Sequence, residues 1–396
     1  MRRRAFLATA GTLLSAGCGA LTGGRNGGGS GDRGPEDWGD EDGPDFTARP
    51  ERTLPEPPGG AQNEYRINTE VDSEIRGVGG GDADIRDPFG VDGGRDDGTP
   101  TQANQEAAEL IGEARNQLDD ALAAYREYAG TNASITDVNA SHTSFNNLTV
   151  EDRVSEAEST LDEAVESATD GQKMNIIGLA HVSVFIRYAA RCQKALGDAF
   201  EEVEFMSERL YNESLRLVDQ GNRQARSAIR EARDAYQVIE SEVEEDAFGA
   251  YGTLSEAIFR EKVQQLDSEI AALDESRSGL RDMKNGVTEL QAGVPAFLDE
   301  RYEEAERRFS GASADFAIAR TSFRLTSGSR EVESKVREIV GVAQTLEQAT
   351  SDLRRAAQAQ LNDERLVFYE ARRAAQQHIE SNEIVRGMRT MNDIVT

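Results

Sequence analysis

Few side chains in this sequence could do covalent or metal chemistry. The 396 residues include three histidines, His142, His181 and His378, and two cysteines, Cys18 and Cys192. The histidines are far apart along the chain, and no HExxH, CxxC or glycine-rich phosphate-binding pattern occurs. Carboxylates are so abundant that no pair of them stands out as an acid and a base. We therefore predict no catalytic residue, no metal site and no cofactor, and we expect a protein that is not an enzyme.

Cys18 has the clearest chemical context of these groups. It follows the segment MRRRAFLATAGTLLSAG, in which Arg3 and Arg4 precede a short apolar run that ends in small residues. The run is too short to span a bilayer, and the segment has the charged start, apolar centre and small-residue end of an export signal. A cysteine directly after such a signal indicates a thiol that receives a lipid once the signal is removed.

This segment resembles the signal peptide and lipobox of twin-arginine-exported prokaryotic lipoproteins. The departure is Ser15, three residues before Cys18, where the lipobox prefers leucine. The resemblance implies a signal peptide over 1–17, a lipid on the Cys18 sulfur and a mature chain on the outer face of the cytoplasmic membrane. An ordinary cleaved signal with an incidental cysteine is the alternative.

The composition is strongly acidic. Asp and Glu number 73 against 44 Lys and Arg, which gives a formal net charge of -29, and only five of the basic residues are lysine. This balance resembles proteins of extremely halophilic archaea, because molar salt screens the self-repulsion that so much negative charge causes; a merely acidic bacterial protein is the alternative. No basic stripe is present that could release counterions from a phosphate backbone, so we expect no nucleic-acid partner.

The chain changes character near residue 100. The segment 18–100 begins with Cys18 and holds 20 of the 37 glycines and eight of the nine prolines, without sustained apolar periodicity. Such a composition predicts a disordered acidic linker between the lipid and the rest of the chain.

The segment 101–396 contains one proline, Pro295, and apolar residues recur through it at alternating spacings of three and four. This is the helical period, and it predicts an all-α domain of about seven or eight long antiparallel helices in a coiled-coil-like bundle. The clearest run repeats every seven residues: Phe259, Leu266, Leu273, Leu280, Val287 and Val294. Its alternate seam position changes from apolar Val263 and Ile270 to Arg277, Lys284 and Gln291.

Two helical segments hold side chains of special interest. Residues 174–186 are apolar almost all round, which predicts the central helix of the bundle, with His181 as a hydrogen-bonded structural residue. Cys192 is expected to be a buried thiol. Asn222 interrupts an apolar stripe, and it either fixes the register between two helices or faces solvent beside Gly221 at a helix break.

Residues 302–312 read YEEAERRFSGA and resemble the second helix of a tetratricopeptide repeat. Tyr302, Ala305, Phe309 and Ala312 have its spacing, and Gly293 stands where the first helix usually has glycine. The fainter echoes elsewhere do not follow the 34-residue period of that family. The resemblance implies, as an alternative to a bundle, a stack of helical hairpins that presents a concave surface to a peptide or protein.

Turn chemistry predicts several helix boundaries. Residues 149–152 and 253–256 suit capping boxes, and residues 248–252 and 327–329 suit turns. The segment 131–147 is rich in Ser, Thr and Asn and predicts a flexible exposed loop. Asn132, Asn139 and Asn147 each begin an Asn-X-Ser/Thr pattern there, and we expect an N-linked glycan on at least one of them. A fourth match at Asn212 lies in a helical run.

These features favour a membrane-anchored helical lipoprotein that acts as a scaffold or protein-binding module of the cell envelope. Its expected partners are the membrane, through the lipid, and an envelope protein. The alternative is a ligand-binding or sensory component in which the helices enclose a small molecule near His181 and Tyr188.

Overall fold

The computed structural model describes residues 102–324 and 328–395. Arg3, Arg4, Cys18 and the predicted linker lie outside these residues, so the signal and lipid attachment stay predictions. The described residues are all-α, as the periodicity predicts, with eleven α-helices and no strand. The α-helices are α2 (Gln102–Arg126), α3 (Asn147–Val165), α4 (Asp170–Tyr211), α5 (Leu215–Glu242), α6 (Ala247–Tyr251), α7 (Glu256–Leu298), α8 (Tyr302–Arg324), α9 (Arg330–Leu361), α10 (Arg365–Ser381), α11 (Glu383–Gly387) and α12 (Arg389–Val395).

Helix α4 is the central element of the first half of the fold. It packs against α2, α3, α5 and α7, and residues 181–186 are buried on every side. This confirms a central helix over the predicted apolar segment, although that segment is part of a 42-residue helix and its first residue, Met174, is exposed. Cys192 is buried in the same helix, as predicted, and burial raises the pKa of its thiol to about 12.

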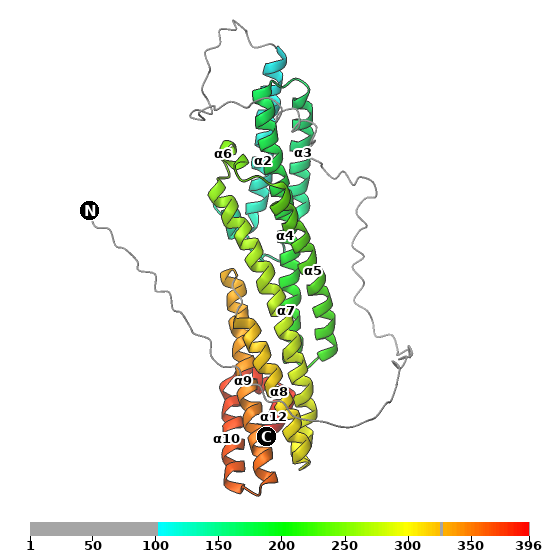
Figure 1. Ribbon diagram of the computed structural model, residues 1–396, viewed down its shortest axis with the longest axis vertical. Helices are drawn as coiled ribbons and strands as arrows, with labels where there is room; N and C mark the ends of the chain where they lie inside the picture. Colours follow the sequence, from blue (N-terminus) through cyan, green and yellow to red (C-terminus); the bar gives the residue numbers. More distant parts are fainter. Residues whose placement is uncertain (1–101, 325–327, 396) are drawn as a thin grey trace, which may run out of the picture. The chain divides into compact units, whose positions relative to one another are not determined.

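Helix α7 joins the two halves of the fold. Its 43 residues correspond to about 65 Å of helix. Near its start it packs on α4, where the rings of Phe259, Phe185 and Phe248 contact one another, and further along it packs on α8 (Figure 1). The seven-residue apolar run predicted from Phe259 onwards is buried along the whole of this helix.

Helices α7 and α8 approach closely because glycines of one face phenylalanines of the other. The glycines are seven residues apart on α7, and the phenylalanines are seven residues apart in reverse order on α8. The three pairs are Gly279 with Phe323, Gly286 with Phe316 and Gly293 with Phe309. A Cβ atom added to any of these glycines would lie only 2.5 to 3.1 Å from the ring that faces it. The glycines are therefore required by packing, since each leaves the space that a ring fills.

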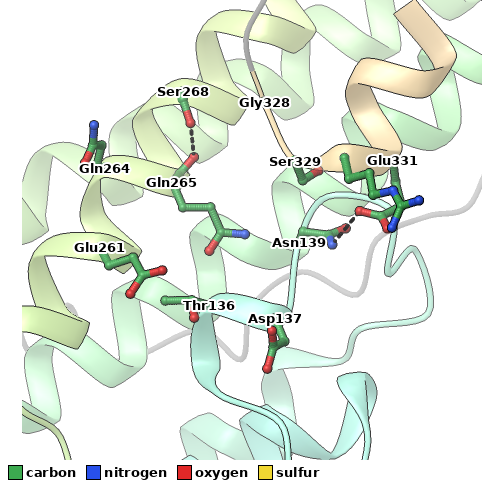
Figure 2. A pocket seen from close by; sticks show the side chains of 11 residues that line it. Thr136, Asp137, Asn139, Glu261, Gln264, Gln265, Ser268, Gly328, Ser329 and Glu331 are labelled. Carbon is green, nitrogen blue, oxygen red and sulfur yellow. Dashed lines mark hydrogen bonds between the residues drawn. The ribbon is translucent and has the colours of Figure 1, made fainter.

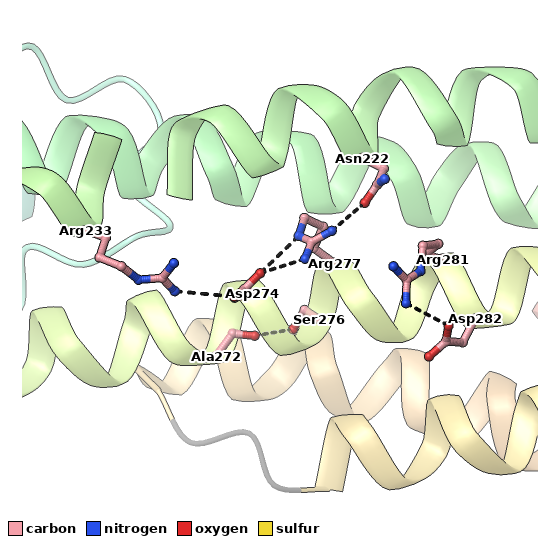
Figure 3. A network of polar contacts seen from close by, with 8 residues as sticks. All are labelled: Asn222, Arg233, Ala272, Asp274, Ser276, Arg277, Arg281 and Asp282. Carbon is pink, nitrogen blue, oxygen red and sulfur yellow. Dashed lines mark hydrogen bonds and ion pairs between the residues drawn. The ribbon is translucent and has the colours of Figure 1, made fainter. Parts of the chain in front are cut away.

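The interface between α5 and α7 is polar. Three side chains of α7 face partners on α5 or at its start: Arg277 with Asn222 at 2.9 Å, Lys284 with Asp219 at 2.8 Å and Gln291 with Glu213 at 3.5 Å. Figure 3 shows that Arg277 also bonds to Asp274, which Arg233 of α5 reaches from the other side. The change from apolar to polar residues along the α7 seam thus matches a change of neighbour, from α4 to α5.

Asn222 lies inside the continuous helix α5 and accepts a hydrogen bond from Arg277. The interpretation that it faces solvent at a helix break is therefore wrong. Its position agrees with the other interpretation, a polar residue that fixes the register of two helices.

Three helical hairpins are closed by the same turn. In residues 212–214, 299–301 and 362–364 the third residue donates its N–H to a carbonyl five residues earlier, at 2.8 Å each time. The middle residues, Glu213, Glu300 and Asp363, have φ values of 57°, 62° and 56°. This is the Schellman arrangement, in which the left-handed position is usually glycine. The turns join α4 to α5, α7 to α8 and α9 to α10.

Some predicted boundaries are displaced. Helix α3 begins at Asn147 and not at the predicted capping box, because the side chain of Asn146 accepts from the N–H of Leu148 and caps the helix earlier. Ser255, not Thr253, caps α7. The predicted turn at 248–252 is mostly the short helix α6, which Gly252 ends with a φ of +84°. None of the helices formed by the described residues combines the length and apolarity needed to cross a bilayer.

Candidate functional site

Large apolar side chains are exposed beside two of the three Schellman turns, those at 299–301 and 362–364. Four residues beside them are largely uncovered: Leu366 at 72%, Tyr369 at 66%, Leu298 at 51% and Leu361 at 48% exposure. We call these four residues the apolar tip. The third turn, at 212–214, differs because Thr390 of α12 donates its backbone N–H and its hydroxyl to the carboxylate of Glu213, both at 2.8 Å.

Aromatic packing holds the two exposed turns together. The ring of Phe297, at the end of α7, stacks on Phe368, at the start of α10, with centroids 6.0 Å apart. Tyr302 and Tyr369 pack edge-on against the same Phe368 ring. The apolar tip therefore lies on a fixed aromatic base, and its geometry does not depend on flexible loops.

Acidic residues outnumber basic ones in the two turns that carry the apolar tip. The exposed acids of the two turns and the adjoining helices are Asp299, Glu300, Glu303, Asp363, Glu364 and Glu370. Arg301 contacts Asp299 at 3.3 Å, and Arg365 lies 4.0 Å from Asp363, so these two bases are paired within the turns. An apolar centre with a negatively charged border is a surface that can bind a partner with apolar and basic side chains.

A second feature is a buried polar cluster between α4, α7 and the loop before α3. Lys262 and Glu269 are fully buried on α7, one heptad apart. The Lys262 ammonium donates to the carbonyl oxygen of Val138 at 2.6 Å and to the Oε1 atoms of Gln193 at 2.9 Å and Gln265 at 3.2 Å.

The carboxylate of Glu269 completes this cluster. It accepts from the N–H of Ala140 at 2.9 Å and from Nε2 of Gln265 at 3.2 Å, so Gln265 bridges the two charges. Burial lowers the pKa of Lys262 to about 8 and raises the pKa of Glu269, and the charge of each partner opposes that effect. The cluster anchors the loop at Val138 and Ala140.

A polar groove of about 620 Å³ lies over this cluster. Residues of the loop, of α7 and of the start of α9 line it, and Figure 2 shows Gln265 extending from α7 toward the loop and Asn139 beside Glu331. The Nδ2 group of Asn139 donates to Glu331 at 3.1 Å, which ties the loop to α9.

The predicted loop is only partly exposed. Val138, Ala140 and Phe145 are buried, because the loop folds back onto α7 and packs on Tyr125 and Tyr128. Its sequons differ accordingly. Asn132 is exposed, Asn139 is 8% exposed, and Asn147 lies in the first turn of α3, where its side chain donates to Glu151.

The residues of the alternative ligand site have structural contacts. The Nδ1 atom of His181 lies 2.9 Å from the carbonyl oxygen of Glu242, so this nitrogen carries the proton, as predicted for a structural histidine. Tyr188 is partly buried, and the guanidinium of Arg191 lies 5.1 Å from the centre of its ring. Neither residue lines the groove described above, nor a second groove that lies between the end of α2 and the start of α3 beside Asn132.

Within residues 102–324 and 328–395, no three His, Cys, Asp or Glu side chains gather as a metal ion would require. No protein-family model, curated protein or solved structure matches the chain. The resemblances to exported lipoproteins and to tetratricopeptide repeats therefore stay expectations.

Neither the apolar tip nor the buried cluster was predicted from the sequence. A signal for the cluster does exist, because Lys262, Glu269 and Ser276 follow one another at seven-residue intervals, three residues after members of the apolar run. That spacing places them one residue before the alternate seam position of Val263 and Ile270, on the flank of the seam, where a charged residue that is buried needs a buried partner.

Proposed function

We propose that this protein is a lipid-tethered helical module of the cell envelope that binds another envelope protein through the apolar tip. The observation that carries the proposal is the exposure of Leu298, Leu361, Leu366 and Tyr369 on a fixed base of stacked rings. Exposed apolar side chains that are clustered and rimmed by polar groups mark contact surfaces, because their burial is favourable and their arrangement needs little reordering.

The acidic border specifies the chemistry of the partner. A surface with apolar side chains and neighbouring Lys or Arg residues would bury the tip and neutralise its border, whereas a second acidic copy would bring like charges together. An anionic lipid surface is disfavoured for the same reason. The proposed lipid on Cys18 would hold the tip on the outer side of the cytoplasmic membrane, and the resemblance of residues 1–18 to a lipoprotein signal supports this part of the proposal.

The tether is tested by replacing the thiol. Cys18→Ser is expected to move the protein from the membrane fraction into the soluble fraction or the medium, because the lipid would be its hold on the membrane. A chain that stays in the membrane fraction after this change contradicts the proposed anchor.

The binding surface is tested by affinity capture from detergent-solubilised membranes in brine. Leu366→Glu combined with Tyr369→Glu should abolish retention of the partner, which is identified by mass spectrometry. Ile318→Glu is the matched control, because Ile318 is 55% exposed on α8 and lies outside the tip. Equal retention of the partner by the tip variant and the Ile318→Glu control would contradict the proposal. So would a tip variant whose only change is that copies of the chain no longer associate with one another.

A further inference from the structure

We propose that Asn132 is the residue of this chain that carries an N-linked glycan. The inference rests on the proposed envelope location, since it requires export. Asn132 opens the sequon Asn132-Ala133-Ser134 and is exposed in an irregular stretch between two 3-10 turns. A transferase must bind the sequon in an extended form. Drawing out this stretch opens the turn bond from the N–H of Ala133 to the carbonyl of Gly130 and the cap that Ser134 makes on one 3-10 turn, but it breaks no α-helix.

The other sequons of the loop are held by the fold. The amide of Asn139 is engaged on both sides, because its Oδ1 accepts from the N–H and hydroxyl of Ser141 and its Nδ2 donates to Glu331. Asn147 is the first residue of α3, and its Nδ2 group donates to Glu151. A folded chain cannot present either amide nitrogen without losing these contacts.

The fourth sequon, at Asn212, is exposed but locked in the turn between α4 and α5. Its Nδ2 group donates to the carbonyl of Glu208 at 2.9 Å. The middle residue of the sequon is Glu213, whose φ of 57° and whose bonds to Thr390 fix the turn. Extension of this sequon would break the hairpin.

A groove beside Asn132 can seat the first sugars. It has a volume of about 800 Å³, and Asn132 lines it together with Asp120, Arg126, Thr149 and Arg153. Carboxylate, guanidinium and hydroxyl groups are donors and acceptors for the hydroxyls of a saccharide. A glycan on Asn132 would therefore cover the ends of α2 and α3.

The reaction is a glycosyl transfer from a lipid-phosphate-linked oligosaccharide. The Nδ2 atom of Asn132 forms a bond with the anomeric carbon as the bond from that carbon to the phosphate oxygen breaks. The lipid phosphate leaves with the electron pair, and the proton lost by Nδ2 passes to a base of the transferase. No oxidation or reduction is involved.

The test is site-resolved mass spectrometry of the chain recovered from its native host. Residues 127–153 form one tryptic peptide that holds three sequons, so cleavage before Asp137 is needed to separate Asn132 from the other two. We expect a glycan on Asn132 alone, lost in Asn132→Gln, kept in Ser134→Thr and kept in the control Asn147→Gln. A glycan on Asn139 or Asn147 overturns the inference. So does an unmodified Asn132 on a chain that added protease digests in intact cells, because such a chain has been exported.

A second arm separates this inference from the proposed location. The purified folded chain is incubated with transferase-containing membranes and the lipid-linked oligosaccharide. Modification of Asn132 alone supports the site whatever the location of the chain, and modification of any other sequon, or of none, contradicts it. If added protease does not digest the chain in intact cells, the result contradicts the proposed location and not the glycan site.

Discussion

The buried cluster predicts strong energetic coupling between Lys262 and Glu269. Both side chains are fully buried, and Gln265 bonds to each of them. Removal of one charge leaves the other without compensation inside the protein, which costs about 3–5 kcal/mol in broken buried pairs. We expect losses of this size in the free energy of unfolding for Lys262→Met and for Glu269→Gln.

The double variant decides whether the two charges act as a pair. With both charges removed, neither is left uncompensated, so the double variant should lose about 1–3 kcal/mol less than the sum of the two single losses. Urea unfolding in molar potassium chloride, followed by circular dichroism, measures all four proteins. Strictly additive losses would refute the coupling.

The pH dependence gives an independent check on Lys262. Burial lowers its pKa to about 8 from the ordinary value of 10.5. Between these values the unfolded chain binds more protons than the folded chain, so this residue makes the free energy of unfolding rise with pH, by at most about 1.4 kcal/mol per pH unit. The wild-type protein should gain stability over Lys262→Met between about pH 8 and pH 9.5. A difference that is flat or falls in this range would contradict the assignment.

Other variants test the packing, the turns and the charge balance. Gly286→Ala should destabilise the protein by about 1–3 kcal/mol, because its Cβ would lie 2.7 Å from the ring of Phe316. Gly341→Ala should instead stabilise it by about 1 kcal/mol, because a Cβ there meets nothing within 4 Å. Thermal melts measure both variants. Glu300→Gly relieves a positive φ and should stabilise by about 0.5–1 kcal/mol, but Glu213→Gly at the equivalent position should destabilise, because its carboxylate holds α12; equal effects in urea unfolding would contradict this distinction. Lowering the salt from about 2 M to about 0.1 M should reduce helicity in circular dichroism, and indifference to salt would contradict the prediction, made from the acidic composition, that the protein is adapted to high salt.

Periodicity was sufficient to predict the helices because each must bury one stripe of apolar side chains. The run from Phe259 to Val294 is buried as predicted, and the polar residues Arg277 and Lys284 mark where α7 changes neighbours. Local capping was less reliable, since Asn146 caps α3 before the predicted residue.

Long-range packing decided what the sequence pattern could not. Lys262 and Glu269 are charged residues of the kind that usually face solvent on a helix. They are buried because the loop before α3 folds back over them, with contacts at Val138 and Ala140. The same fold of the loop buries Asn139, whereas Asn132, which begins the same Asn-X-Ser pattern, stays exposed. Leu366 and Tyr369 lie three residues apart on α10, off the buried stripe that begins at Phe368, and no described element covers them.

Photo-crosslinking in intact cells tests the central claim most directly. A photoreactive phenylalanine derivative is placed at Tyr369 in the apolar tip and, as a control, at Ile318 on α8. The proposed function predicts that position 369 alone yields a cross-link to a different envelope protein, through a segment that carries apolar residues beside Lys or Arg. A cross-link from 369 to lipid or to a second copy of the chain, or the same product from 318, would contradict it.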